Sequence, residues 1–179
     1  MDSTTNQSGA GLSYGLIAGL IICIITLLQY LGGLDMYFSP VGYTSYLVVV
    51  TMAVLAALKV RRSNEGFLEF RDALKITFSV FVIALLLQTI FTYVLFNFID
   101  TDFRDAVSHE ALNRTEQMLR KFGTSDSDIE ELIEAERSKD QFSIGRIMLG
   151  FAVTAIICFI FCLLISLIVK RSKPAFNNI

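Results

Sequence analysis

The sequence predicts an all-α integral membrane protein, a bundle of four membrane-spanning helices with an extramembrane helical hairpin between spans three and four. Of its 179 residues, 54% are hydrophobic and only 18% are charged, with a mean hydropathy of +0.59. Soluble domains carry about 25% charged residues. The apolar residues gather in four runs that can each cross ~30 Å of hydrocarbon as a helix of ~1.5 Å per residue. One long polar stretch, residues 100–143, separates the last two runs.

The first run covers residues 12–31 and follows a polar N-terminal tail, residues 1–11, that we expect to be mobile. Gly11, Gly15 and Gly19 recur at every fourth position, a glycine-zipper spacing that lets two membrane helices approach closely. This stripe predicts helix packing. The packing partner is either another span of the same chain or a second copy of it.

The second run covers residues 41–58, and a charged connector, residues 63–74, follows it. Phe67 and Phe70 share one helical face of this connector, with charged residues elsewhere. The pattern predicts an amphipathic helix on the membrane surface or an ordinary extension of span three.

The third run, residues 76–99, carries four polar side chains at helical spacing, Gln88, Thr92, Tyr93 and Asn97. An unpaired amide in hydrocarbon costs several kcal/mol, so such groups must face protein or water. We therefore predict hydrogen bonds between helices. The alternative is the lining of a pore or of a ligand pocket.

Two helices are expected in residues 100–143. Asp102 can cap a helix that continues to about Phe122, where Gly123 is a suitable stop. The sequence from Ser127 to Glu130 has capping-box spacing and can open a second helix that ends near Arg137. The sequence thus predicts a charged helical hairpin.

The fourth run covers residues 147–169 within a C-terminal segment, residues 144–179, that ends in a basic tail. Basic residues flank spans two, three and four on one side, and cytoplasmic loops carry the excess of Lys and Arg. Both termini are therefore expected in the cytoplasm and residues 100–143 outside it. The interfacial residues that carry this prediction are Lys59, Arg61, Arg62, Phe67, Phe70, Arg71, Lys75, Lys170, Arg171 and Lys173.

No catalytic constellation is visible in the sequence. The four runs contain no charged residue and no histidine, whereas proton relays and most coupled transporters need such groups at membrane depth. Asp100, Asp102 and Asp105 form an acidic cluster that suits either a divalent cation or the start of a helix. We favour the helix start, and expect no metal, no cofactor and no nucleic-acid partner.

Two segments resemble a known family. Gly66-Phe67 followed by Phe70, Ala73 and Lys75 is similar to the start of span three in an uncharacterised four-helix membrane family, domain of unknown function 4199. Residues 97–103 (NFIDTDF) are similar to that family's end of span three, with Thr101 in place of a proline. The resemblance implies a Bacteroidetes-type bacterial inner membrane and no assigned activity.

Together these observations predict a non-enzymatic, multi-pass membrane protein that acts as an accessory or scaffold subunit. The expected contacts are the lipid bilayer and either a membrane-protein partner or a second copy. The family resemblance also implies a link to envelope or lipid-linked-sugar metabolism. The alternative is a small transporter or channel lined by the polar stripe on span three.

Overall fold

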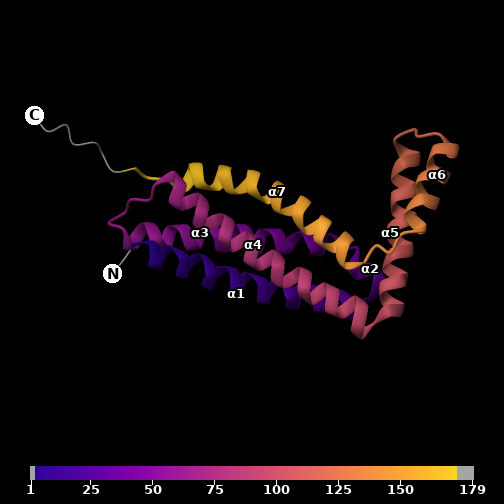
Figure 1. Ribbon diagram of the computed structural model, residues 1–179, viewed down its shortest axis with the longest axis horizontal. Coiled ribbons are helices and arrows are strands. Elements are labelled where there is room, and N and C mark those ends of the chain that lie inside the picture. The colour runs from indigo at the N-terminus through magenta and orange to yellow at the C-terminus, as the bar shows by residue number, and fades with distance from the viewer. Residues whose placement is uncertain (1–2, 173–179) are drawn as a thin grey trace, which may run out of the picture.

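The computed structural model describes residues 3–172 and shows the predicted all-α architecture (Figure 1). Four segments are long and apolar enough to cross a membrane, namely Gly9–Leu31, Gly33–Ser63, Phe70–Ile99 and Ile144–Val169. The helices are α1 (Ser3–Leu31), α2 (Gly33–Tyr37), α3 (Thr44–Ser63), α4 (Phe70–Val94), α5 (Thr101–Lys121), α6 (Asp126–Arg137) and α7 (Ile144–Val169). A 3-10 turn η1 (Pro40–Tyr43) precedes α3, and a π-helical turn η2 (Leu95–Ile99) follows α4.

Two boundaries differ from those expected. Helix α1 begins at Ser3, so most of the segment that we expected to be a mobile tail continues the first spanning helix. No separate surface helix forms in the connector, because α3 runs to Ser63 and α4 already begins at Phe70. The turn between them contains Glu65 and Gly66, both with positive φ (54° and 86°). The second half of the connector is thus an extension of span three.

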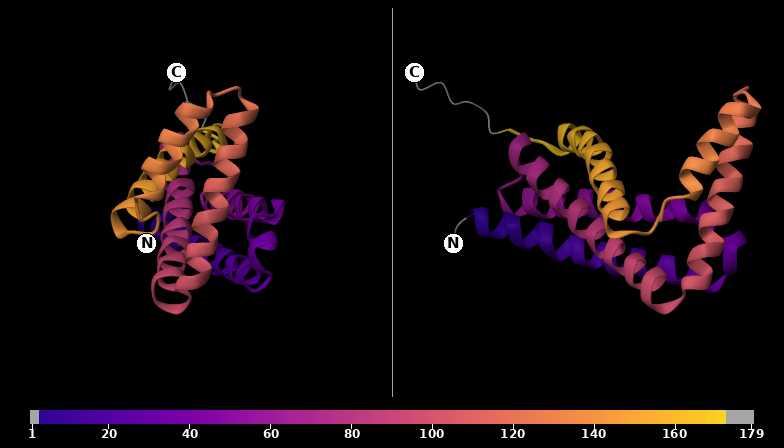
Figure 2. Two further views of the ribbon diagram at one scale, coloured as in Figure 1. Left: turned by 90° about the vertical axis from the view of Figure 1, so that its right-hand side faces the viewer. Right: turned by 45° about the vertical axis from the view of Figure 1, so that its right-hand side comes forward.

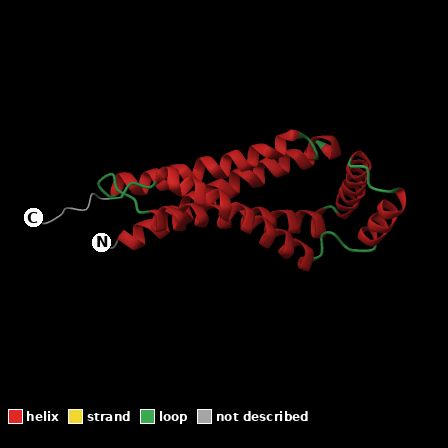
Figure 3. Cartoon of the chain, turned by 90° about the horizontal axis from the view of Figure 1, so that it is seen from above, coloured by secondary structure: helices red, strands yellow, loops and turns green. Residues whose placement is uncertain are grey.

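Helix α4 is the centre of the bundle and packs against α1, α3 and α7. Helix α7 packs mainly against α4 and touches α3 only weakly. Seen from above, the pair α1 and α3 and the pair α4 and α7 lie close together near the termini and diverge toward the hairpin (Figure 3). The bundle therefore has a packed half near the termini and an open half near the hairpin.

Small side chains close the packed half. Ala53, Ala57 and Ala73 are fully buried there. The hydroxyl groups of Thr77 on α4 and Ser166 on α7 lie 3.2 Å apart, and each also donates to a carbonyl of its own helix. Every buried hydroxyl in this core is therefore paired, as hydrocarbon surroundings require.

The glycine stripe of α1 lies against α4. A Cβ added at Gly15 would approach Ile83 Cβ to 2.9 Å, and one at Gly19 would approach Leu87 Cδ1 to 2.6 Å. A Cβ at Gly11 would approach Ser79 Cβ to 2.9 Å. The glycines therefore serve a close approach of two helices within the same chain, which leaves this face of α1 covered.

The open half ends at a sharp corner where the chain turns into the hairpin, which runs crosswise to the bundle (Figure 2). In the π-helical turn, the backbone N–H of Asp100 donates to the carbonyl of Leu95 (2.9 Å). The Asp100 carboxylate then accepts the N–H of Phe103 (2.8 Å) and the hydroxyl of Tyr30 (2.8 Å). Asp100, and not Asp102 as predicted, is the cap of α5.

The hairpin forms as expected, with one further correction. Ser125, and not Ser127, caps α6 by accepting the N–H of Asp128 (3.3 Å). Gly123 follows α5 with φ of 78°, a conformation that favours glycine after a helix. The capping-box spacing from Ser127 thus placed the start of this helix two residues too late.

Candidate functional site

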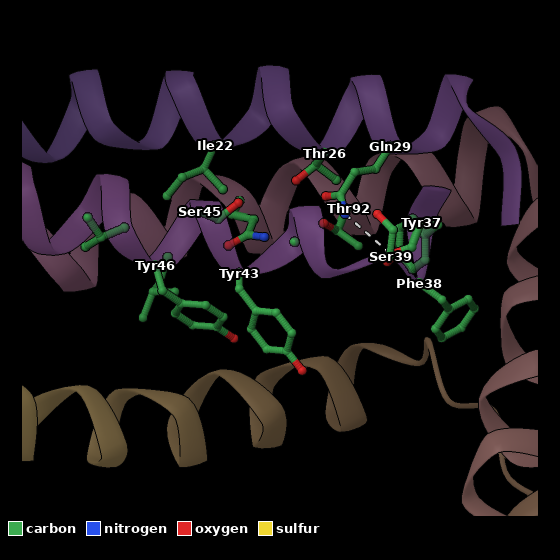
Figure 4. A pocket seen from close by; sticks show the side chains of 14 residues that line it. Ile22, Thr26, Gln29, Tyr37, Phe38, Ser39, Tyr43, Ser45, Tyr46 and Thr92 are labelled. Atoms are coloured by element: carbon green, nitrogen blue, oxygen red, sulfur yellow. Dashed lines mark hydrogen bonds between the residues drawn. The ribbon is translucent and has the colours of Figure 1, made fainter. Parts of the chain in front are cut away.

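A cleft opens in the diverging half of the bundle. One part, about 320 Å³, lies among α1, the α2–α3 connection, α3 and α4. A second part, about 300 Å³, lies between these elements and α7, and the two parts share Tyr37, Tyr46, Leu85, Gln88 and Thr92. We call this continuous space the α3–α7 cleft. Figure 4 shows Tyr43 and Tyr46 projecting from the α3 side toward α7.

The lining of the α3–α7 cleft includes many polar side chains. Four of its lining side chains, Thr26, Ser45, Gln88 and Thr92, make no hydrogen bond to another residue in the described part of the chain. Gln29 makes one, from its Nε2 to the carbonyl of Tyr37 (3.3 Å). No enclosed polar side-chain atom among the described residues lacks a partner. The unpaired groups therefore reach the open surface of the cleft.

The cleft extends deep into the predicted spans. Thr154 lies about ten residues, or ~15 Å, from the start of α7 at the hairpin end. Because a hydrocarbon core is ~30 Å thick, a cleft of this depth equals about half of that thickness. Polar groups at this depth need a partner that the bilayer itself does not supply.

The polar stripe that the sequence indicated on span three divides into two parts. Gln88 and Thr92 line the cleft, with Thr89 beside them. Asn97 instead donates to the carbonyls of Tyr93 (3.1 Å) and Phe142 (3.2 Å), and so ties the corner to the segment before α7. The ring of Tyr93 packs edge-on against Phe98. Gln88 and Thr92 therefore border the open cleft, whereas Asn97 makes hydrogen bonds within the protein.

The polar groups contributed by α1 and α3 to the cleft were missed at the sequence level. Thr26 and Gln29 are polar residues of the first run, three residues apart, and Ser45 is the second residue of α3. The positions of Thr26 and Gln29 on one face of the first helix were a usable signal. That they face Gln88 and Thr92 follows only from how the helices pack.

The hairpin carries a second concave surface. A groove of about 440 Å³ runs between α5 and α6, and we call it the hairpin groove. Its lining is mainly apolar and includes Leu112, Leu119, Leu132 and Ile133. On the same hairpin Met118 and Phe122 are 59% and 80% exposed. Exposed apolar surface of this kind marks a contact site.

Ion pairs connect the hairpin to α7. Glu136 near the end of α6 accepts from Lys139 (2.7 Å), Gln141 (3.0 Å) and Arg146 on α7 (2.6 Å). The hydrogen bond from Lys139, followed by those from Gln141 and Arg146, lowers the pKa of the Glu136 carboxyl to about 2. Glu136 is therefore charged throughout the neutral range and links three segments.

The acidic cluster is used by the protein itself. Hydrogen bonds from the Phe103 N–H and the Tyr30 hydroxyl lower the pKa of the Asp100 carboxyl. Asp105 pairs with Arg104 (2.9 Å), and Asp102 is exposed in the first turn of α5. Within residues 3–172, no group of three or more metal-ligating side chains is positioned to hold an ion.

Several of the predicted interfacial residues contact neighbouring helices at the end of the bundle near the termini. Arg61 donates to the carbonyl of Val169 at the end of α7 (3.1 Å). Leu68 and Arg171 pair through two backbone hydrogen bonds (2.9 and 2.8 Å). The ammonium of Lys59 lies 5.5 Å from the centre of the Tyr14 ring. Arg62, Arg71, Lys75 and Lys170 are exposed, Phe67 and Phe70 are half-buried, and Lys173 lies outside the described residues.

Comparison with models of protein families shows to which family the chain belongs. Residues 13–171 match the model of a family described as "protein of unknown function (DUF4199)". The chain belongs to this family. A search of curated proteins found no match, and a search of solved structures found none either.

The two segments that carried the resemblance both form turns in the structure. Gly66 supplies the positive φ of the α3–α4 turn, and residues 97–103 build the corner before α5. Thr101, where the resemblance led us to expect a proline, is the first residue of α5 after its cap. Proline is favoured at that position because its missing N–H is unpaired there in any case. The corner forms without it.

Proposed function

We propose that this DUF4199 protein is a non-enzymatic accessory or scaffold subunit of a bacterial inner membrane. The observation that supports the proposal is the hairpin groove, an apolar surface outside the membrane that is held at a fixed place by the corner and by Glu136. An exposed apolar groove on a positioned element is typical of a docking site. The envelope or lipid-linked-sugar role implied by the resemblance stays part of this proposal.

The topology belongs to the same proposal. With both termini in the cytoplasm, the hairpin lies on the outer face of the membrane and the groove receives an extracytoplasmic segment of a partner. The basic side chains at the opposite end of the bundle support this orientation. A reporter fused at Phe122 that is active only in the cytoplasm would reverse it.

Co-purification tests the proposal directly. The tagged full chain is extracted in several mild detergents, and the proteins that elute with it are identified by mass spectrometry. We expect a membrane-protein partner that is lost in Leu132→Glu, since a buried carboxylate disfavours docking in an apolar groove. Gln117→Glu, which adds the same carboxylate at an exposed polar position of α5 outside the groove lining, should retain it. A bare monomer in every detergent contradicts the proposal.

A second candidate is a small transporter, and the observation that favours it is the position of Gln88 and Thr92 in the α3–α7 cleft. The packed half closes the cleft toward the termini, so transport requires the helices to rearrange. Flux of ions or small lipids in liposomes that is lost in Gln88→Leu would favour this candidate. Without flux it is rejected.

A further inference from the structure

We propose that the α3–α7 cleft is a binding site for a neutral lipid of the diacylglycerol class. Its hydroxyl and ester groups would lie among Thr26, Gln29, Ser45, Gln88 and Thr92, and its acyl chains would leave between α3 and α7 into the bilayer. This inference rests on the cleft alone and is independent of the accessory role proposed above.

The first step is the need for an occupant. The side chains of Thr26, Ser45, Gln88 and Thr92 are unpaired within the described chain and reach the cleft surface. Each unsatisfied polar group costs several kcal/mol in hydrocarbon. The cleft thus requires a molecule that brings hydrogen-bond donors and acceptors to this depth.

The second step concerns charge. Among the described residues that line the cleft, none is an Asp, Glu, Lys, Arg or His. A phosphate or ammonium group placed there would have no counterion, and an uncompensated charge in a low-dielectric site is far more costly than an unpaired hydroxyl. The chemistry of the lining therefore selects a neutral molecule.

Two cations near the cleft lining, Arg114 and Arg146, do not change this conclusion, and Arg146 already pairs with Glu136 (2.6 Å). The guanidinium of Arg114 lies 4.6 Å from the centre of the Phe38 ring at the mouth of the cleft. It also pairs with Glu110 (2.7 Å). Because its charge is already compensated, it offers little to an additional anion.

The third step is shape. The two parts of the cleft, about 320 and 300 Å³, are at the lower limit of typical ligand sites of ~300–1,000 Å³. Such a volume suits a headgroup and glycerol backbone better than a whole lipid. Since α3 and α7 hardly touch, the side facing the bilayer is free for acyl chains. A diacylglycerol matches the depth, the opening and the neutral hydrogen-bonding surface.

Photolabelling tests the proposal. The full chain is reconstituted in phosphatidylcholine nanodiscs with a diacylglycerol that carries a diazirine on one acyl chain near the glycerol. Phosphatidic acid with the same chains and diazirine is the matched comparison, because it differs only by the phosphate. We expect diacylglycerol to label peptides that contain residues 43–49 and 147–154, roughly tenfold more than phosphatidic acid does.

Competition and variants complete the test. Excess unlabelled diacylglycerol should abolish the labelling of the unmodified protein, which requires no variant to fold. The double variant Gln88→Leu with Thr92→Val should lose roughly tenfold of the labelling, because two hydrogen-bonding groups are removed. Thr51→Val, an exposed position of α3 outside the cleft lining, should leave it unchanged.

Three results would overturn the proposal. Equal labelling by phosphatidic acid shows that the cleft does not exclude charge. Labelling that unlabelled diacylglycerol does not compete shows that no site exists. Protection of the same peptides by a co-purified membrane protein assigns the cleft to a partner helix.

Discussion

The two halves of the bundle are built from the same four spans but by opposite means. In the packed half, alanine and glycine allow α1, α3 and α7 to approach α4, and the few hydroxyls are paired. In the open half, tyrosine, phenylalanine, glutamine and threonine occupy the corresponding faces, and the helices separate. Membrane helices lack a strong hydrophobic drive to associate, so side-chain size and polarity determine where they meet.

This difference indicates which half of the bundle determines stability and which half determines binding. Overpacking is tolerated least where helices already touch, and a change of chemistry matters most where polar groups are unpaired. The packed half is thus expected to determine the stability of the protein, while the open half determines what it binds.

The largest expected effect is the insertion of a side chain into the packed half. Gly15→Leu should lower the free energy of unfolding in detergent by about 1–3 kcal/mol, because even a Cβ there approaches Ile83 Cβ to 2.9 Å. Gly150→Leu is the matched control in the open half, where nothing lies within 4 Å of an added Cβ. It should be neutral or stabilising. Equal losses in both variants would remove the distinction between the halves.

A smaller effect is expected at the corner that holds the open half. Asp100→Ala removes the cap of α5 and the acceptor of the Tyr30 hydroxyl, so the unfolding temperature should fall by about 2–4 °C. Tyr30→Phe, which removes only one of these bonds, should cost less. Asp102→Ala serves as control because Asp102 is not the cap. A larger loss in Asp102→Ala would contradict the assignment.

The smallest effect concerns pH and Glu136. Its pKa is lowered from 4.5 to about 2 in the folded protein, so its stabilising contribution is complete above pH 4.5 and is lost as the pH falls toward 2. The protection factors of the amides in residues 136–146, taken relative to the intrinsic exchange rate at each pH, should therefore fall across this window. Glu136→Gln should remove that dependence, and the exposed Glu131→Gln should keep it. An unchanged profile in Glu136→Gln would disprove the role of Glu136.

The sequence was sufficient to predict the four spans, the hairpin and its glycine stop, because these depend on local hydropathy and local capping. It was insufficient for the choice between neighbouring caps. Asp100 and Asp102 are both good caps, and the contacts that distinguish them include the bond between Asp100 and Tyr30, 70 positions away. The π-helical turn that positions Asp100 leaves no sequence signal that we recognised.

The candidate site was only half visible in the sequence. Gln88 and Thr92 were noticed because polar residues within an apolar run are conspicuous. Tyr43 and Tyr46 were not noticed, since tyrosine near a membrane interface is ordinary. That all four border one cleft depends on α3 and α7 diverging, which is a property of the packing of whole helices and of no local pattern.

The pairing of Leu68 with Arg171, beside the bond from Arg61 to the carbonyl of Val169, has a consequence for biosynthesis. Arg61 and Val169 are 108 positions apart in the sequence. The ribosome synthesises the chain from its N-terminus, so the α3–α4 turn is made long before α7. The α3–α4 turn closes through its own bonds, such as Gly66 N–H to the carbonyl of Arg61 (2.9 Å), but the backbone groups of Leu68 must stay bound to water until α7 has been inserted. Formation of this contact marks the moment at which all four spans are in place, and its protection from exchange would report on assembly in a living cell.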